Sequence, residues 1–287
     1  MTTVRNRHCT AIAAGLSAWV LALPVFSAPA TALTPAGELA SHRAVYELTL
    51  KQSRGKSAPA AARGRILYDF SGSVCEGYAL KFRQVSELDS GEGKITLSDL
   101  RSTTWEHGEA KSFRFNSENY INERLIEAII GQAQRQAAGI EVTLTKPGDR
   151  KLDLVSTVVF PTEHMRRILV AAREGKTILE VPVYDGADTG AKVYNTLTVI
   201  GAAIPPDVNV PTDAAAGQRV LAGLKRWPVT ISYFDGAAKP GDQQPLYAIS
   251  FEVYENGISR ALLLDYNTFS ISGEMTVLEI KDTKPCK

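Results

Sequence analysis

Apolar and polar residues alternate along most of the chain, which is the pattern of half-buried β-strands. In the segment 44–51, for example, Ala44, Tyr46 and Leu48 occupy every second position. Comparable runs lie at 66–70, 78–83, 95–105, 178–184, 191–200, 248–254, 258–264 and 268–280. About a dozen strands are more than one flat sheet usually holds before it curls or splits. The pattern therefore predicts a mainly β fold, either a barrel, an open barrel or a sandwich.

One segment predicts a helix. Residues 161–174 place Ile168, Leu169 and Ala172 on one face, with Pro161 at the start and Gly175 just past the end. Proline in the first turn and glycine after the last turn are typical helix boundaries. The fold should therefore contain few helices, of which this one is the clearest.

Two further segments carry local signals. The isoleucines of 113–135 lie close to helical spacing, whereas Gly131 favours a strand, so both structures stay open there. Asn256-Gly257 lies between two predicted strands and suits the two-residue type I′ turn of a β-hairpin.

The N-terminus predicts export. Two arginines precede an apolar run at 11–23, and small residues follow at 30–32, which is the order found in a cleavable secretory signal. Pro24 interrupts the run after thirteen residues, short of the ~20 that span a membrane. We expect residues 1–32 to be removed and residues 33–287 to form a single, soluble domain in the periplasm.

Charge narrows the choice of partners. Without residues 1–32, the chain has 30 basic and 31 acidic residues, interspersed along its length. Nucleic acids and anionic membranes are bound by clustered Lys and Arg, so neither is an expected partner. We expect envelope proteins, or an envelope lipid or peptide, as partners.

Cysteine usage predicts a disulfide. Cys9 leaves with the signal, so Cys75 and Cys286 remain as a pair in an oxidising compartment. The alternative, a redox-active pair, usually needs a close Cys-x-x-Cys spacing, which these residues lack.

The sequence contains no recognisable catalytic or cofactor motif. Nucleophile elbows, zinc spacings, phosphate loops and calcium loops are all absent. His42, His107 and His164 are far apart, and we expect His164 only to cap its helix or to hydrogen-bond locally. We therefore predict a non-enzymatic protein without catalytic residues, metal or cofactor, although carboxylates from distant strands can still converge as they do in glycoside hydrolases.

Aromatic residues are the candidate ligand-binding side chains. They can line a groove in an open barrel, or they can simply pack in ordinary strands, where aromatic residues are favoured. The candidates are Trp105, Trp227, Tyr233, Tyr247 and Tyr254.

Several motifs in order resemble one known family. They are SHRAVY at 41–46, YDF at 68–70, CEGY at 75–78, FPTEH at 160–164, PVYDG at 182–186, RWPV at 226–229 and YENGIS at 254–259. Together they resemble the cell envelope integrity EipB family of periplasmic proteins, formerly a domain of unknown function. The resemblance covers nearly the whole mature chain, and both cysteine positions agree with the disulfide of that family.

The resemblance implies a spiral-like or broken antiparallel β-barrel with a few short helices, and it favours a strand at 124–135. It also implies a role in envelope integrity under stress, without a known reaction. The leading hypothesis is a non-catalytic periplasmic factor. The alternatives are a carrier or sensor that holds a lipid, lipoprotein or peptide in an aromatic groove, and an envelope-acting hydrolase.

Overall fold

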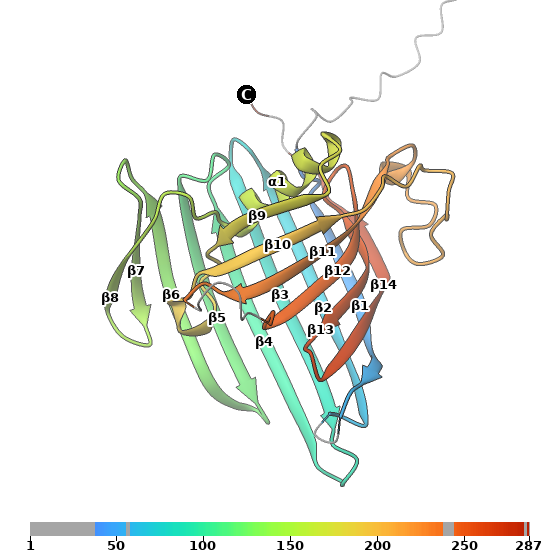
Figure 1. The fold of residues 1–287 in the computed structure, drawn as a ribbon, viewed down its shortest axis with the longest axis horizontal. Helices are drawn as coiled ribbons and strands as arrows, with labels where there is room; N and C mark the ends of the chain where they lie inside the picture. The colour runs from blue at the N-terminus through green and yellow to red at the C-terminus, as the bar shows by residue number, and fades with distance from the viewer. Residues whose placement is uncertain (1–37, 56–57, 238–243, 284–285, 287) are drawn as a thin grey trace, which may run out of the picture. The chain divides into compact units, whose positions relative to one another are not determined.

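The computed structural model describes residues 38–55, 58–237, 244–283 and 286, so the predicted signal at 1–32 lies outside it. The fold is one antiparallel sheet of fourteen strands among these residues (Figure 1). The strands are β1 His42–Ser53, β2 Ala61–Ser73, β3 Gly77–Asp89, β4 Ile95–Glu106, β5 Ser112–Ile121, β6 Arg124–Arg135, β7 Ile140–Lys146, β8 Arg150–Leu154, β9 Ile178–Val183, β10 Tyr194–Ile200, β11 Arg226–Asp235, β12 Tyr247–Tyr254, β13 Ser259–Asp265 and β14 Phe269–Ile280.

The sheet consists of two meanders that meet at β1. Strands β1 to β8 pair in chain order, β9 to β14 also pair in chain order, and β14 returns to pair with β1. Strands β8 and β9 are the two edges and do not pair with each other, so the sheet is not closed. The mainly β, broken antiparallel barrel predicted from the sequence is therefore confirmed.

The sheet curls because its two halves share a core. Tyr78 of β3 packs in one apolar cluster with Trp227 of β11, Val253 of β12 and Ile168 of the helix. In Figure 1, strands β9 to β12 cross in front of β3 to β5, with the helix above them. Burying apolar surface from both halves against each other stabilises the curled sheet over a flat one.

The helix predicted at 161–174 is confirmed as α1, Pro161–Arg173, which connects the two edge strands. Ile168, Leu169 and Ala172 are buried, and Gly175 follows with a φ of +72°. Two short 3₁₀ turns, Asp188–Gly190 and Arg219–Leu221, are the other helical segments described. Among the described residues, no helix has the length and apolar character needed to cross a membrane.

The ambiguous segment 113–135 forms the hairpin of β5 and β6. Gly131 belongs in the sheet because a Cβ there would lie 2.6 Å from Cζ of Phe115 and 2.8 Å from Cδ2 of Leu144. The aromatic ring fills the space that a larger residue on β6 would need. Packing between strands thus overrides the near-helical spacing of the isoleucines.

The predicted type I′ turn at Asn256-Gly257 is wrong. The loop between β12 and β13 spans residues 255–258, and Gly257 has a positive φ whereas Asn256 does not, although a type I′ turn needs both. The Asn256 carbonyl accepts a 2.9 Å hydrogen bond from the Ala40 amide, and Leu39 packs against Gly257. These contacts with the chain before β1 favour the longer loop.

Candidate functional site

Strands β4 to β7 present mainly polar side chains on the outer face of the sheet. On β5, Phe113 and Phe115 are buried in the core, whereas Arg114 between them and Asn116 after them are exposed. Because side chains alternate along a strand, Arg114 and Asn116 lie on the face opposite the core. This outer face carries the candidate site.

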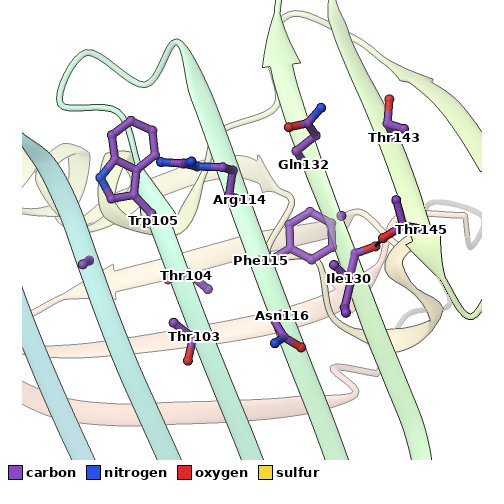
Figure 2. Close-up of a pocket in the computed structure, with 12 residues that line it drawn as sticks. Thr103, Thr104, Trp105, Arg114, Phe115, Asn116, Ile130, Gln132, Thr143 and Thr145 are labelled. Atoms are coloured by element: carbon purple, nitrogen blue, oxygen red, sulfur yellow. Dashed lines mark hydrogen bonds between the residues drawn. The ribbon is translucent and has the colours of Figure 1, made fainter.

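A groove with a volume of about 590 Å³ runs across this face. Its lining is mixed: one indole, one guanidinium, two amides and several threonine hydroxyls (Figure 2) lie on a surface that is mainly apolar. The lining residues are Ala79, Thr103, Thr104, Trp105, Arg114, Phe115, Asn116, Ile130, Gly131, Gln132, Thr143 and Thr145. We call this the outer groove.

The register of the strands brings its polar side chains into one row. Trp105 of β4 is opposite Arg114 of β5, which is opposite Gln132 of β6, which in turn is opposite Thr143 of β7. Directly opposite residues in antiparallel strands have Cβ atoms about 5 Å apart, close enough for neighbouring side chains to act on one ligand. Figure 2 shows the four side chains on successive strands.

Trp105 and Arg114 contact each other. The guanidinium carbon of Arg114 lies 4.3 Å from the ring centroid of Trp105, within the range of a cation–π interaction. On the β3 side, the indole packs against Gly77, where a Cβ would lie only 2.5 Å from Cζ2 of Trp105. Gly77 thus makes room for the indole, and the indole supports the guanidinium.

Glu106, the residue after Trp105, points to the other face of β4. Its two carboxylate oxygens accept the backbone N–H groups of Thr162 and Glu163 at 2.7 and 2.8 Å. These amides lie in the first turn of α1 and lack partners within the helix. Burial raises the pKa of the Glu106 carboxyl to about 7, against the effect of these hydrogen bonds. Trp105 therefore faces the outer groove, whereas Glu106, the next residue of β4, faces the helix.

The five predicted aromatic residues do not line one groove. Trp105 lies in the outer groove, whereas Trp227 and Tyr254 are buried in separate apolar clusters. Tyr233 and Tyr247 are stacked on the inner face, with ring centroids 4.5 Å apart. Tyr194 meets both of them edge-on. Of the five predicted residues, the structure therefore brings together Tyr233 and Tyr247, and it separates the other three.

Cys75 and Cys286 form a disulfide, as the sequence predicts, with their Cα atoms 5.7 Å apart. Cys75 lies in the turn between β2 and β3, and Cys286 follows β14. The C-terminal segment is also held at Ser41, whose carbonyl accepts the Lys281 amide at 2.9 Å. The two cysteines are 211 residues apart in the sequence, unlike the close spacing of most redox-active pairs.

The histidines remain apart. His42 lies on β1, His107 follows β4 and His164 lies in α1. Among the described residues, no three His, Cys, Asp or Glu side chains are grouped so that they could hold a metal ion. His164 is buried rather than a cap, and its Nε2 lies 3.5 Å from the Thr196 hydroxyl. The cap of α1 is instead Glu106, which is distant in sequence.

Sequence reasoning missed Arg114, Gln132 and Thr143. Alternation along β5 indicates that Arg114 is outside, but it does not indicate which residues lie next to it. That information depends on the register of four strands. Trp105 is the one residue of this row that the sequence singled out.

These features define a β-barrel-like class of protein: an unclosed, curled antiparallel sheet with one helix packed against its core and a disulfide at its C-terminal end. The chain belongs to the EipB-like family, whose model matches residues 33–282. It is 35% identical over 256 residues to the cell envelope integrity protein EipB of Brucella abortus (strain 2308), with 89% of each chain covered.

A solved structure shows the same architecture. It is the crystal structure of a beta-barrel-like protein of domain of unknown function DUF1849 from Brucella abortus. The match has a TM-score of 0.78 at 34% sequence identity, and it covers 85% of this chain and 99% of that one.

Proposed function

We propose that this protein is a non-catalytic periplasmic factor that supports cell envelope integrity under stress by binding an envelope component in its outer groove. The secretory pattern at 1–32 supports export, and the name of the Brucella relative supports the envelope role. Residues 33–287 would then be the mature protein.

The observation that carries the binding role is the chemistry of the outer groove. Its lining supplies guanidinium, amide and hydroxyl groups around a supported indole. These groups hold a ligand by hydrogen bonds and charge. The twelve lining residues include threonine hydroxyls, which become nucleophiles only beside a base, but no carboxylate, imidazole, thiol or amine to act as that base or as a general acid. We therefore assign the groove to binding and not to catalysis.

Deletion and complementation test this proposal. Cells without the gene should lose tolerance of detergents and cell-wall antibiotics, and the wild-type gene should restore it. Arg114→Ala should restore it poorly at equal protein level. The matched control is Arg63→Ala, which removes an exposed arginine of the same sheet that is paired with Glu87 outside the groove. Unchanged tolerance after deletion, or full restoration by Arg114→Ala, would contradict the proposal.

A second candidate is a carrier or sensor for a lipid, lipoprotein or peptide. The stacked, half-buried pair Tyr233 and Tyr247 on the inner face favours it. Native mass spectrometry of protein taken gently from the periplasm should then detect a bound molecule. Tyr247→Ala should lose that molecule while Arg114→Ala keeps it. Empty protein in every preparation would remove this candidate.

A further inference from the structure

Arg114 differs from the arginines beside it on the outer face. The arginines of β1 to β4 on this face each contact a carboxylate. The pairs are Arg43 with Glu279, Arg63 with Glu87, Arg65 with Glu47, and Arg83 and Arg101 with Asp99. Within the described part of the chain, Arg114 has no carboxylate partner. Its positive charge is therefore available to a ligand in the outer groove.

The guanidinium of Arg114 is also held in place. Its contact with Trp105 restricts the side chain, and Gly77 supports the indole from the β3 side. A guanidinium is a planar fork of N–H donors that matches two oxygens of a carboxylate or a phosphate. Restricting a side chain before binding lowers the entropy that is lost on binding. Arg114 is thus placed as a receptor for an anionic group.

The neighbouring groups suit hydroxyl-rich ligands. Gln132 and Thr143 continue the row from Arg114, and Asn116 and Thr103 lie opposite each other in the next row (Figure 2). Amides both donate and accept hydrogen bonds, and so do hydroxyls, so they can pair with sugar hydroxyls in either sense. The groove combines one cationic position with a field of such groups.

The strand pairing argues against a peptide ligand. An extended peptide usually binds a sheet by adding a strand to a free edge, where it makes main-chain hydrogen bonds. Strands β4 to β7 are each paired on both sides, so the outer groove has no free strand edge. Recognition here must come from side chains alone, which favours a ligand that is itself rich in hydroxyls.

We infer that the outer groove binds an acidic glycan, with a sugar carboxylate on Arg114 and sugar hydroxyls on Gln132, Thr143 and Asn116. This inference rests on the proposed function, because it names the class of ligand for the same site. The unpaired and supported guanidinium carries it.

Isothermal titration calorimetry on the exported protein tests the inference. The probes are tetragalacturonate, the neutral tetramer chitotetraose, inorganic phosphate and an acidic hexapeptide. Tetragalacturonate should bind more tightly than the other three. Arg114→Ala should weaken it by about 10- to 100-fold, because it removes the charged hydrogen-bond donors. Arg114→Lys keeps the charge but not the planar fork, so it should restore binding only in part.

Matched controls separate binding from folding. Arg63→Ala should bind tetragalacturonate like wild type, and Gln132→Ala should weaken it less than Arg114→Ala does. Equal affinity for chitotetraose, phosphate or the hexapeptide would overturn the inference. Binding that survives Arg114→Ala in a folded protein would also overturn it.

The two proposals fail in different ways. If Arg114→Ala fails to restore envelope tolerance but tetragalacturonate does not bind, the glycan assignment is wrong and the proposed function stands. If tetragalacturonate binds through Arg114 but Arg114→Ala restores full tolerance, the glycan assignment stands and the proposed function is wrong.

Discussion

Glu106 accepts a 2.7 Å hydrogen bond from the backbone N–H of Thr162, so a residue of β4 caps a helix that begins more than fifty positions later. Phe160 at the N-cap position has no side-chain hydrogen bond to the helix. The chain therefore satisfies the first turn of α1 from the sheet instead of from its own cap. This contact fixes the end of β4 that also presents Trp105 to the outer groove.

Removing this cap should destabilise the protein. Glu106→Ala leaves the Thr162 and Glu163 amides without their partner, and an unsatisfied buried donor costs about 1–3 kcal/mol. Urea unfolding should show a lower free energy of unfolding by about that amount. Glu109→Ala, in the loop that follows β4, is the control and should have little effect because Glu109 is exposed. Equal losses in both variants would show that Glu106 does not act as the cap.

Acid should destabilise the protein through His164. Burial lowers the pKa of its imidazole to about 4, whereas the ordinary value is 6.5. Between these values the unfolded chain binds a proton that the folded protein excludes, so stability is lost as the pH falls through this window. The shift in pKa corresponds to a loss of about 3 kcal/mol in the free energy of unfolding. His42 acts in the same sense, because burial lowers its pKa as well.

In wild type, the free energy of unfolding should fall as the pH is lowered from 7 to 4, and we call the steepness of this fall the acid slope. His164→Gln should have a smaller acid slope than wild type in unfolding curves recorded over this range. Glu106 has the opposite effect. Because its pKa is raised, it adds to the free energy of unfolding below about pH 4.5, and this contribution is lost as the pH rises toward 7. Glu106→Gln should therefore steepen the acid slope. Parallel slopes for wild type and His164→Gln would contradict the assignment to His164.

The Cys75–Cys286 disulfide should raise the melting temperature. A closed loop of this length restricts the unfolded chain by as much as about 5 kcal/mol in the loop-entropy model. Cys75→Ser should lower the melting temperature by several degrees without abolishing the fold, because β14 remains paired with β1. Reductant should lower the melting temperature of wild type to the same value and leave the variant unchanged. Equal melting of wild type with and without reductant would contradict this role.

Local sequence patterns predicted much of the fold because strands and helices depend largely on residues that are close together in the sequence. Alternation at 44–51 identified β1, and Pro161 with Gly175 bounded α1. The Asn256-Gly257 turn was wrong because Leu39 and the Ala40 amide, both distant in sequence, contact that loop. Contacts of this kind leave no signal in the segment itself.

The candidate site was less predictable for the same reason. Trp105, Arg114, Gln132 and Thr143 are unevenly spaced along the chain, and only the pairing of four strands brings them into one row. The predicted aromatic residues are of one chemical type but lie in different places, since Trp227 and Tyr254 pack in the core. Residue type indicated which groups can bind, and the register decided which groups lie together.

Tryptophan indole resonances provide the most direct test of the outer groove. The chain has three tryptophans, and Trp19 lies within the predicted signal, so the exported protein should show two indole N–H signals. Trp105 contacts Arg114 in the groove, whereas Trp227 is buried in the core. In a ¹H–¹⁵N titration with tetragalacturonate, the Trp105 signal should move and the Trp227 signal should stay fixed. A fixed Trp105 signal, or equal movement of both, would contradict ligand binding in the outer groove.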